Sequence, residues 1–235
     1  MLGRFLEYAV PTSRLLESLD FYSQLGFATA ADTGAAAERY VALGDGRLTV
    51  ALHGSALEEP TLVFVCPGFI GEVERLEVAG LSIDWVSGGD HTFNRLEGRL
   101  PNGTPISLVE ARTHSPLPNY NSQLGWFEEI WLPIIPTEHK ADCWEGLGFV
   151  AFEVIDGVGP RITLTSDTLS IGLHETLSPA RPWLTFYCDD VSALRETLSR
   201  LGIQEDRRLA PTLDRATHVV LVAPEGTLIV ARSIS

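Results

Sequence analysis

Apolar residues follow two periods along this chain, and the two periods alternate in a regular order. Residues Arg4 to Val10 are mostly apolar, which is typical of a buried strand. Leu15, Leu16, Leu19 and Tyr22 then recur at helical spacing, after a Pro-Thr-Ser sequence that offers candidate helix caps. Three further strands are predicted from residue 27, over 40–44 and over 48–53. The first part of the chain therefore predicts one strand, one helix and three strands.

The same order of elements recurs in the next stretch of chain. A strand is predicted over 61–66, a helix over 71–79, and three strands over 81–86, 93–100 and 105–111. Residues 112–125 hold two prolines and two asparagines with little apolar periodicity, which is typical of a linker. The order of strand, helix and three strands starts again at residue 126.

A direct sequence repeat accompanies this recurrence. The stretch from Phe5 to Phe27 returns 122 positions later as Phe127 to Phe149, and seven of 23 positions are identical. Composition alone would give roughly one or two matches in such a window. A match at a fixed period is the signature of internal duplication. We therefore expect an N-terminal domain over 1–111, a linker over 112–125 and a C-terminal domain over 126–235.

Composition limits the kinds of partner that the protein can have. The chain has 235 residues, is 45% hydrophobic and carries a formal net charge of −14, with Lys140 as its only lysine. Such a chain can bury a core, and its acidity gives no general attraction for nucleic acid phosphates or anionic membranes. We expect neither nucleic acid nor membrane as a partner.

The sequence also predicts a cellular compartment. The chain starts directly in a predicted strand, with no signal peptide pattern and no apolar stretch of membrane-spanning length, so the cytoplasm is the expected compartment.

The three cysteines, Cys66, Cys143 and Cys188, show no zinc-binding spacing. Cys66 and Cys188 lie 122 positions apart at matching strand positions, so we expect two small buried side chains rather than a disulfide.

Several short motifs point to one known family. Ser18-Leu19-Asp20-Phe21-Tyr22, followed by Leu25-Gly26-Phe27, is close to an S-L-x-F-Y-x-x-x-L-G-F helix. Cys188-Asp189-Asp190-Val191 and two P-x-G-T turns, at 101–104 and 224–227, add to it. The chain thus resembles the vicinal oxygen chelate superfamily of glyoxalase I, bleomycin resistance proteins and extradiol dioxygenases. The resemblance implies an α+β fold of four βαβββ units, paired into two glyoxalase-like, cup-shaped domains.

The resemblance also implies where metal ligands would lie. In metal-using relatives, His, Glu or Gln occupies four strand positions in each cup. These positions fall on Glu7, Ala51, Thr61 and Ser107 in the first half and on Glu129, Gly172, Trp183 and Val230 in the second. A transition metal needs three or more N, O or S ligands, so we expect no metal and no other cofactor. If a metal did bind, Glu7 with His53 and Glu129 with His174 would be the weak candidates.

These same four residues are the candidates for catalysis. Glu7 and Glu129 stand in the middle of apolar strands, where a carboxylate is costly unless it is paired. Two interpretations stay open: a structural hydrogen bond or salt bridge, or a ligand anchor or general base with a raised pKa. His53 and His174 end equivalent strands beside those glutamates, either as acid–base partners or as residues at the rim of the cup.

Aromatic residues mark a candidate binding surface in the second half. Trp183, Thr185 and Tyr187 alternate on one face of a predicted strand, and Trp131 on the neighbouring strand can join them. Such a surface suits a planar or apolar ligand, and the alternative is ordinary core or interface packing. Trp126 is expected at the interface between the domains. The remaining histidines, His91, His114, His139 and His218, show no ligand spacing and are expected at the surface.

The sequence therefore favours a metal-independent protein that binds a small, largely apolar or aromatic molecule. The alternative is a metal-dependent lyase, isomerase or extradiol-type dioxygenase of the same superfamily, so whether the protein is an enzyme stays open. A third possibility is that the two cups serve only assembly. A small-molecule ligand is the expected partner, in a monomer or a homodimer, because duplication within the chain completes each cup without a second copy.

Overall fold

The computed structural model describes residues 1–30, 40–54, 57–89, 92–115, 117, 121–133, 141–156, 159–174, 181–207 and 213–233. His91 and His139 lie outside these ranges. Among the described residues, no helix combines the length and the apolar character that crossing a lipid bilayer requires.

The first half of the chain builds a mixed sheet of eight strands in the order β2-β3-β4-β1-β5-β8-β7-β6. Its elements are β1 (Arg4–Pro11), α1 (Leu15–Gln24), β2 (Ala28–Thr29), β3 (Tyr40–Gly44), β4 (Thr49–His53), β5 (Thr61–Val65), the 3-10 helix η1 (Phe69–Glu72), α2 (Val73–Val78), β6 (Ser82–Ser87), β7 (Arg95–Arg99) and β8 (Pro105–Val109).

The second half builds a sheet of seven strands in the order β10-β11-β12-β9-β13-β15-β14. Its elements are β9 (Trp126–Pro133), α3 (Ala141–Leu147), β10 (Val150–Asp156), β11 (Gly159–Thr165), β12 (Ser170–His174), β13 (Trp183–Tyr187), α4 (Val191–Leu201), β14 (His218–Val222) and β15 (Leu228–Arg232). Strands and helices thus follow the predicted α+β plan of βαβββ units, and the described residues of the last unit form one strand fewer than the plan has.

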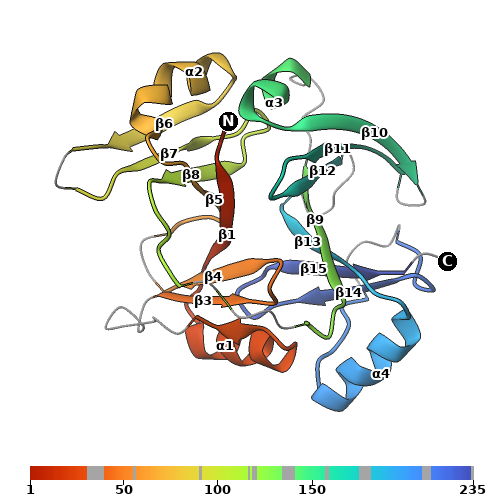
Figure 1. Cartoon of the computed structure of the whole chain (residues 1–235). Coiled ribbons are helices and arrows are strands. Elements are labelled where there is room, and N and C mark those ends of the chain that lie inside the picture. The colour runs from red at the N-terminus through yellow and green to blue at the C-terminus, as the bar shows by residue number, and fades with distance from the viewer. Residues whose placement is uncertain are drawn as a thin grey trace.

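The first strand of each half lies in the middle of its sheet. β1 pairs in parallel with β4 and antiparallel with β5, and β9 pairs in the same two ways with β12 and β13. In Figure 1 the two sheets lie beside each other, with α1 and α4 at one side of the molecule and α2 and α3 at the other. Glu7 pairs with Val63, and Glu129 pairs with Thr185, so each glutamate stands at the centre of a sheet.

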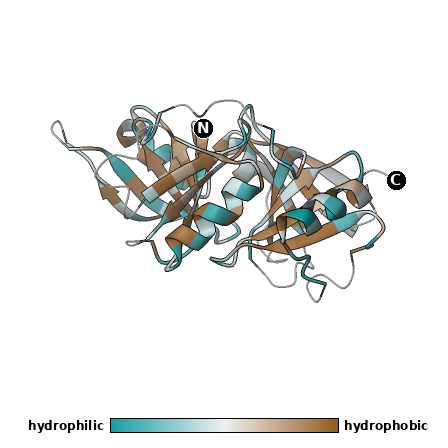
Figure 2. Ribbon diagram, turned by 90° about the horizontal axis from the view of Figure 1, so that it is seen from below, coloured by the Kyte–Doolittle hydropathy of each residue, from teal (hydrophilic) through white to brown (hydrophobic). Residues whose placement is uncertain are grey.

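One apolar core runs through both halves. Phe27 from the first half packs edge-on against Phe186 from the second, with ring centroids 6.3 Å apart. Backbone bonds also cross the junction, from Leu2 N to Leu147 O (3.0 Å) and from Gln123 N to Leu25 O (2.8 Å). Apolar residues follow the strands through both lobes in Figure 2. The halves therefore share buried surface, which stabilises their arrangement.

Local sequence explains both ends of α4, whereas two expectations for α1 are corrected. Asp190 caps α4 by accepting bonds from Ser192 N (2.7 Å) and Ala193 N (3.2 Å), and Gly202 ends that helix in the left-handed region. The predicted caps of α1 are wrong: Arg14 is the N-cap and makes no side-chain cap bond. Leu16 was expected on the apolar face of α1, but it is 78% exposed.

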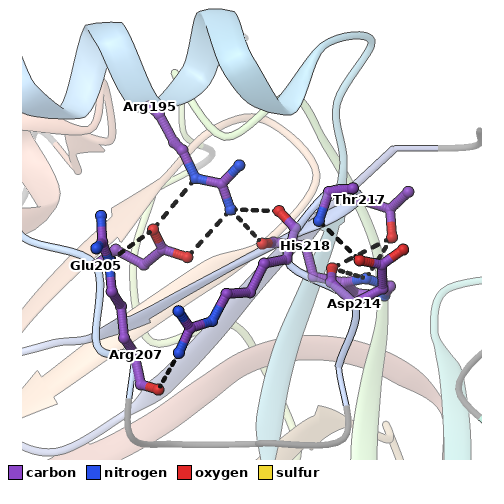
Figure 3. A network of polar contacts seen from close by, with 8 residues as sticks. Arg195, Glu205, Arg207, Asp214, Thr217 and His218 are labelled. Carbon is purple, nitrogen blue, oxygen red and sulfur yellow. Dashed lines mark hydrogen bonds and ion pairs between the residues drawn. The ribbon is translucent and has the colours of Figure 1, made fainter.

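Arg195 links several segments at the β14 edge of the second sheet. In the first sheet the corresponding edge is formed by β6. Arg195 on α4 donates two bonds to the Glu205 carboxylate, both of 3.2 Å. It also donates to the carbonyls of Arg215 (2.7 Å) and His218 (2.8 Å). Figure 3 shows Arg195 between Glu205 and His218. A guanidinium has five donors in a fixed fork, so one side chain can tie three segments together.

All three cysteines are free thiols. Cys66 and Cys188 are buried just beyond the ends of β5 and β13, as expected for small apolar side chains. Burial is the main reason that the thiol pKa of each is raised.

Candidate functional site

The carboxylate of Glu7 lies at the centre of a polar cluster in the first half. Glu7 is only 3% exposed. The Tyr40 hydroxyl on β3 donates to Oε2 of Glu7 at 2.7 Å, and Nε2 of His114 lies 3.3 Å from the same oxygen. Tyr40 also lies 3.3 Å from the Thr113 hydroxyl. A buried carboxylate needs such partners, because desolvation without them is costly.

His114 was expected at the surface, and that expectation is wrong. The residue follows β8 in the predicted linker, yet it is only 8% exposed. Its Nδ1 lies 3.0 Å from the Ser115 carbonyl, and its Nε2 faces Glu7. Burial lowers the pKa of the ring, but bonding to Glu7 and Ser115 raises it by more, so the net shift is upward. No periodicity in the linker could have signalled this inward position.

His53 lies next to Tyr40 and opposite Pro11 in the register of β1 and β4, and its predicted pairing with Glu7 stays a prediction. Its ring packs edge-on against Tyr40, with centroids 4.9 Å apart. Its Nε2 is buried and has no hydrogen-bond partner among the described residues. Burial is the main cause that lowers its pKa, and the positive charge of Arg95 lowers it further against the opposing effect of Glu7. His53 is therefore neutral at neutral pH.

A hollow of about 390 Å³ lies on the same sheet face as Glu7, over β5, β8 and β7. Thr61 and Ser107 line it, at two positions where metal-using relatives carry ligands. Arg95 also lines it, donates to the Ser107 hydroxyl at 3.1 Å and pairs with Glu97 at 2.9 Å. Glu7 and Ser107 both lie opposite Val63 in the strand register, so they are about 10 Å apart across two strand spacings.

Glu129, the matching glutamate of the second half, is 2% exposed and bonded differently. The indole Nε1 of Trp131 donates to its Oε1 at 2.8 Å. The Thr185 hydroxyl donates to the Glu129 carbonyl at 2.7 Å and accepts from the Glu129 N–H at 3.3 Å. Thr185 thus bonds the backbone of β9, so its hydroxyl is engaged within the protein.

Aromatic side chains fill the space above Glu129. Trp131 stacks on Trp183 with centroids 6.1 Å apart and a 26° interplanar angle, and on His174 at 4.4 Å. Trp131 is 0%, Trp183 2% and His174 3% exposed. A ligand in this cup would have to displace the stack. Binding at Trp131, Trp183, Thr185 and Tyr187 stays a prediction.

Gly172 explains how Glu129 and Trp131 fit together. A Cβ atom at residue 172 would lie 2.9 Å from Cδ1 of Trp131 and 3.1 Å from Oε1 of Glu129. Both distances are shorter than ordinary van der Waals contact. The missing side chain at this position therefore leaves room for the glutamate and the indole that bonds it.

The metal site of the superfamily does not fit these residues. Of the eight strand positions, only Glu7 and Glu129 carry metal-binding types, and both carboxylates are bonded by Tyr40 or Trp131. Among the residues that the structure describes, no group of three or more His, Cys, Asp or Glu is arranged to hold a metal ion. Three ligands are the minimum for a robust transition-metal site.

The sequence also predicted positions for Trp126, at the interface between the domains, and for His218, at the surface. Trp126 is 55% exposed, and its contact with the first half is made by Arg47, whose guanidinium carbon lies 3.7 Å from the ring centroid. His218 is partly buried, with Nδ1 2.9 Å from the Thr217 hydroxyl and 3.1 Å from the Asp214 carbonyl (Figure 3). His218 is thus a bonded residue of the sheet edge and not a free surface side chain.

Solved dioxygenase structures share this fold. A crystal structure of catechol 2,3-dioxygenase aligns with 99% of this chain and 88% of its own, with a TM-score of 0.59 and 13% identity. The 2,3-dioxygenase LapB from Pseudomonas sp. KL28 aligns with 99% and 92%, at a TM-score of 0.62 and 17% identity. A variant of homoprotocatechuate 2,3-dioxygenase from Brevibacterium fuscum aligns with 99% and 72%, at 0.65 and 13%.

No protein-family model matches the chain, and no curated protein sequence is similar to it. The structural likeness confirms the two-domain glyoxalase-like fold that the motifs implied. At these identities it establishes the fold and not the reaction, because one fold hosts many functions.

Proposed function

We propose that the protein binds a small organic molecule without a metal ion and that the first-half cup is the site. The contrast between the two cups carries this proposal. Buried tryptophans occupy the second cup, whereas the first has a hollow of about 390 Å³ lined by the hydroxyl-bearing Thr61 and Ser107. A concave site with a few placed polar groups is what a small ligand requires.

The lining favours a ligand with a polar group on a small body. Two arginines (Arg95, Arg99) and four carboxylates (Glu58, Glu59, Asp84, Glu97) line the hollow, so a ligand with a high negative charge is disfavoured. Arg95 and the Ser107 hydroxyl supply donors, while Leu57 and Ile106 supply apolar contact. The Thr61 hydroxyl donates to the Glu59 carbonyl at 3.0 Å and can accept from a ligand. The guanidinium of Arg95 suits a carboxylate or another planar acceptor. The ligand expected from the aromatic residues of the second cup was more apolar, so a panel of probes should include both kinds.

The cluster of Glu7, Tyr40 and His114 supports two roles beside this hollow. It fixes the linker over the cup, and it provides an acid–base pair on the same sheet face. Proton transfer requires a group within hydrogen-bond reach of the ligand. Binding alone does not require a proton-transfer group within reach of the ligand, so binding is the function we propose. Catalysis would require that the ligand also reaches Glu7.

The alternative is a metal-dependent lyase, isomerase or ring-cleaving dioxygenase. The fold favours it, because dioxygenase structures align with 99% of the chain. The available metal ligands count against it, because Ala51, Thr61 and Ser107 stand at strand positions where metal-using relatives carry metal ligands in addition to the position of Glu7. Use of the cups for assembly alone, in a monomer or a homodimer, is the third possibility. We keep the cytoplasm as the compartment, which the three free thiols support.

Ligand binding can be tested by thermal shift and calorimetry with small aromatic acids, phenols and neutral aromatic compounds. Arg95→Gln and Ser107→Val should each weaken binding about tenfold or more, because each removes a donor from the hollow. Trp183→Phe is the matched test of the second cup and should leave affinity unchanged. Loss of binding in Trp183→Phe alone would move the site to the second cup.

Metal dependence has its own test. We expect elemental analysis of the purified protein to find no stoichiometric Fe, Mn, Ni or Zn, and calorimetric titration to find no tight site. Tight binding of one metal per chain that is lost in Glu7→Ala or Glu129→Ala would overturn the metal-independent proposal and favour the enzyme.

A further inference from the structure

A second polar pocket lies where the two halves of the chain meet, away from the hollow of the first cup. Its volume is about 390 Å³. Four separate segments line it: the start of β1, the turn before β4, the chain after β8, and the turn between β11 and β12. Arg4, Arg47 and Arg112 come from three of these segments, and Thr168 comes from the fourth.

These three arginines differ from most others in the chain. Seven described arginines form ion pairs with carboxylates: Arg14, Arg75, Arg95, Arg99, Arg195, Arg207 and Arg232. Within the described part of the chain, Arg4, Arg47 and Arg112 have no such pair. Among the described residues that line the pocket, Asp167 is the only acidic one, so this part of the lining carries a formal charge of +2 from three arginines and one aspartate.

This concentration of charge is notable in a protein whose net charge is −14. Three guanidinium groups around one hollow repel one another, and a bound anion would relieve that repulsion. Arginine also presents paired N–H donors that match the oxygens of carboxylate and phosphate groups.

Packing fixes one of the three guanidinium groups. The Arg47 guanidinium carbon lies 3.7 Å from the centroid of the Trp126 ring. A guanidinium stacked on an indole face keeps its N–H groups free at its edge, because those donors lie in the guanidinium plane. Trp126 thus positions Arg47 and provides a fluorescent group next to the pocket.

We propose that this pocket binds a small anion with two or more negative charges, such as a compact organic carboxylate or a phosphate. Two observations limit the ligand to a small one. The pocket holds only about 390 Å³, and the remainder of the chain is strongly acidic and repels extended polyanions.

The pocket also shares a residue with the first cup. His114 is one of the residues that line the pocket, and its Nε2 lies 3.3 Å from Oε2 of Glu7. An anion among the arginines would therefore lie beside the ring that covers Glu7. The anion site stands independently of the proposed function, because its three arginines do not line the hollow over β5, β8 and β7.

Calorimetric titration at low ionic strength tests the proposal with citrate, malonate, phosphate and sulfate as probes. We expect saturable binding of at least one probe. Arg47→Gln and Arg112→Gln should each weaken it about tenfold or more, since each removes one charged donor pair. Arg200→Gln is the matched control, because Arg200 is exposed on α4 and outside the pocket, and its affinity should equal that of the wild type.

Fluorescence of Trp126 gives a second measurement of binding at the pocket. Probe binding should change the emission of Trp126, and Trp126→Phe should remove that change. The relative affinities of the carboxylate probes and of phosphate and sulfate identify the class of ligand. Equal affinity in the wild type, Arg47→Gln, Arg112→Gln and Arg200→Gln would overturn the proposal, as would no saturable binding of any probe. If Arg47→Gln or Arg112→Gln has a lower melting temperature than the wild type in the absence of a probe, Arg4→Gln takes its place in the titration.

Discussion

Nε2 of His114 lies 3.3 Å from Oε2 of Glu7, and the two residues come from opposite ends of the first half. The same carboxylate oxygen accepts the Tyr40 hydroxyl at 2.7 Å. Segments from β1, β3 and the chain after β8 therefore converge on one buried oxygen. The polar centre of the first cup is closed by the protein's own side chains, which favours the structural hydrogen bond over the ligand anchor, the two interpretations that the sequence left open for Glu7.

The first prediction concerns the contribution of His114 to stability. Its pKa is raised in the folded protein, so the folded state binds more protons than the unfolded state above the ordinary pKa of 6.5. The resulting stabilisation is fully present below that value and is lost as the pH rises through the raised pKa. His114→Gln should therefore be less stable than the wild type at about pH 5.5, and the difference should shrink by about pH 8.5.

Chemical denaturation across this pH range measures the difference in free energy of unfolding. A difference that is constant with pH would show that His114 stabilises the fold only by packing. His218→Gln serves as a comparison, because His218 bonds to Thr217 and Asp214 and does not contact Glu7.

The second prediction has the opposite sign. The pKa of His53 is lowered in the folded protein, chiefly by burial, so the unfolded state binds more protons below the ordinary pKa of 6.5. The wild type therefore loses stability through His53 as the pH falls below that value. His53→Gln should gain stability relative to the wild type as the pH falls, in the same denaturation experiment. A relative loss at low pH would contradict the lowered pKa.

The sequence predicted most of the strands, their order along the chain and the mid-strand position of Glu7 and Glu129, because apolar periodicity and helix-ending glycines are local signals. That His53 approaches Glu7 stays a prediction, because parity along one strand assigns only a sheet face and the register places His53 opposite Pro11. These successes depend on short-range patterns that a single sequence contains.

The sequence could not predict what each glutamate bonds. His114 approaches Glu7 from a segment without periodicity, and no local pattern reports that a linker folds inward. The indole of Trp131 turns toward Glu129 because Gly172 leaves room across the strand pair. Contacts of this kind depend on side-chain packing between strands that are far apart in sequence. The sequence shows that the two cups differ in their side chains, but the hydrogen-bond partners of each glutamate emerge only in three dimensions.

The third prediction concerns the bond between Trp131 and Glu129. Trp131→Phe removes the indole donor of a 2.8 Å bond to a buried carboxylate, and a lost bond of this kind costs about 1–3 kcal/mol. Trp144→Phe is a matched control, since Trp144 is also buried and its Nε1 has no hydrogen-bond partner in the described part of the chain. Urea denaturation should find Trp131→Phe less stable than Trp144→Phe by that amount. Equal losses would assign the whole effect to cavity formation.

The fourth prediction tests the space at residue 172. Gly172→Ala would place a Cβ atom 2.9 Å from Cδ1 of Trp131 and 3.1 Å from Oε1 of Glu129, inside a fully packed region. Overpacking of this kind costs about 1–3 kcal/mol, which urea denaturation would detect as a lower midpoint. Gly71→Ala is the control, because its new Cβ would meet nothing within 4 Å, and its effect should stay within about 0.5 kcal/mol. If both variants were equally stable, the stack of Trp131 on Trp183 would be loose enough to yield, and a ligand could then enter the second cup by displacing it.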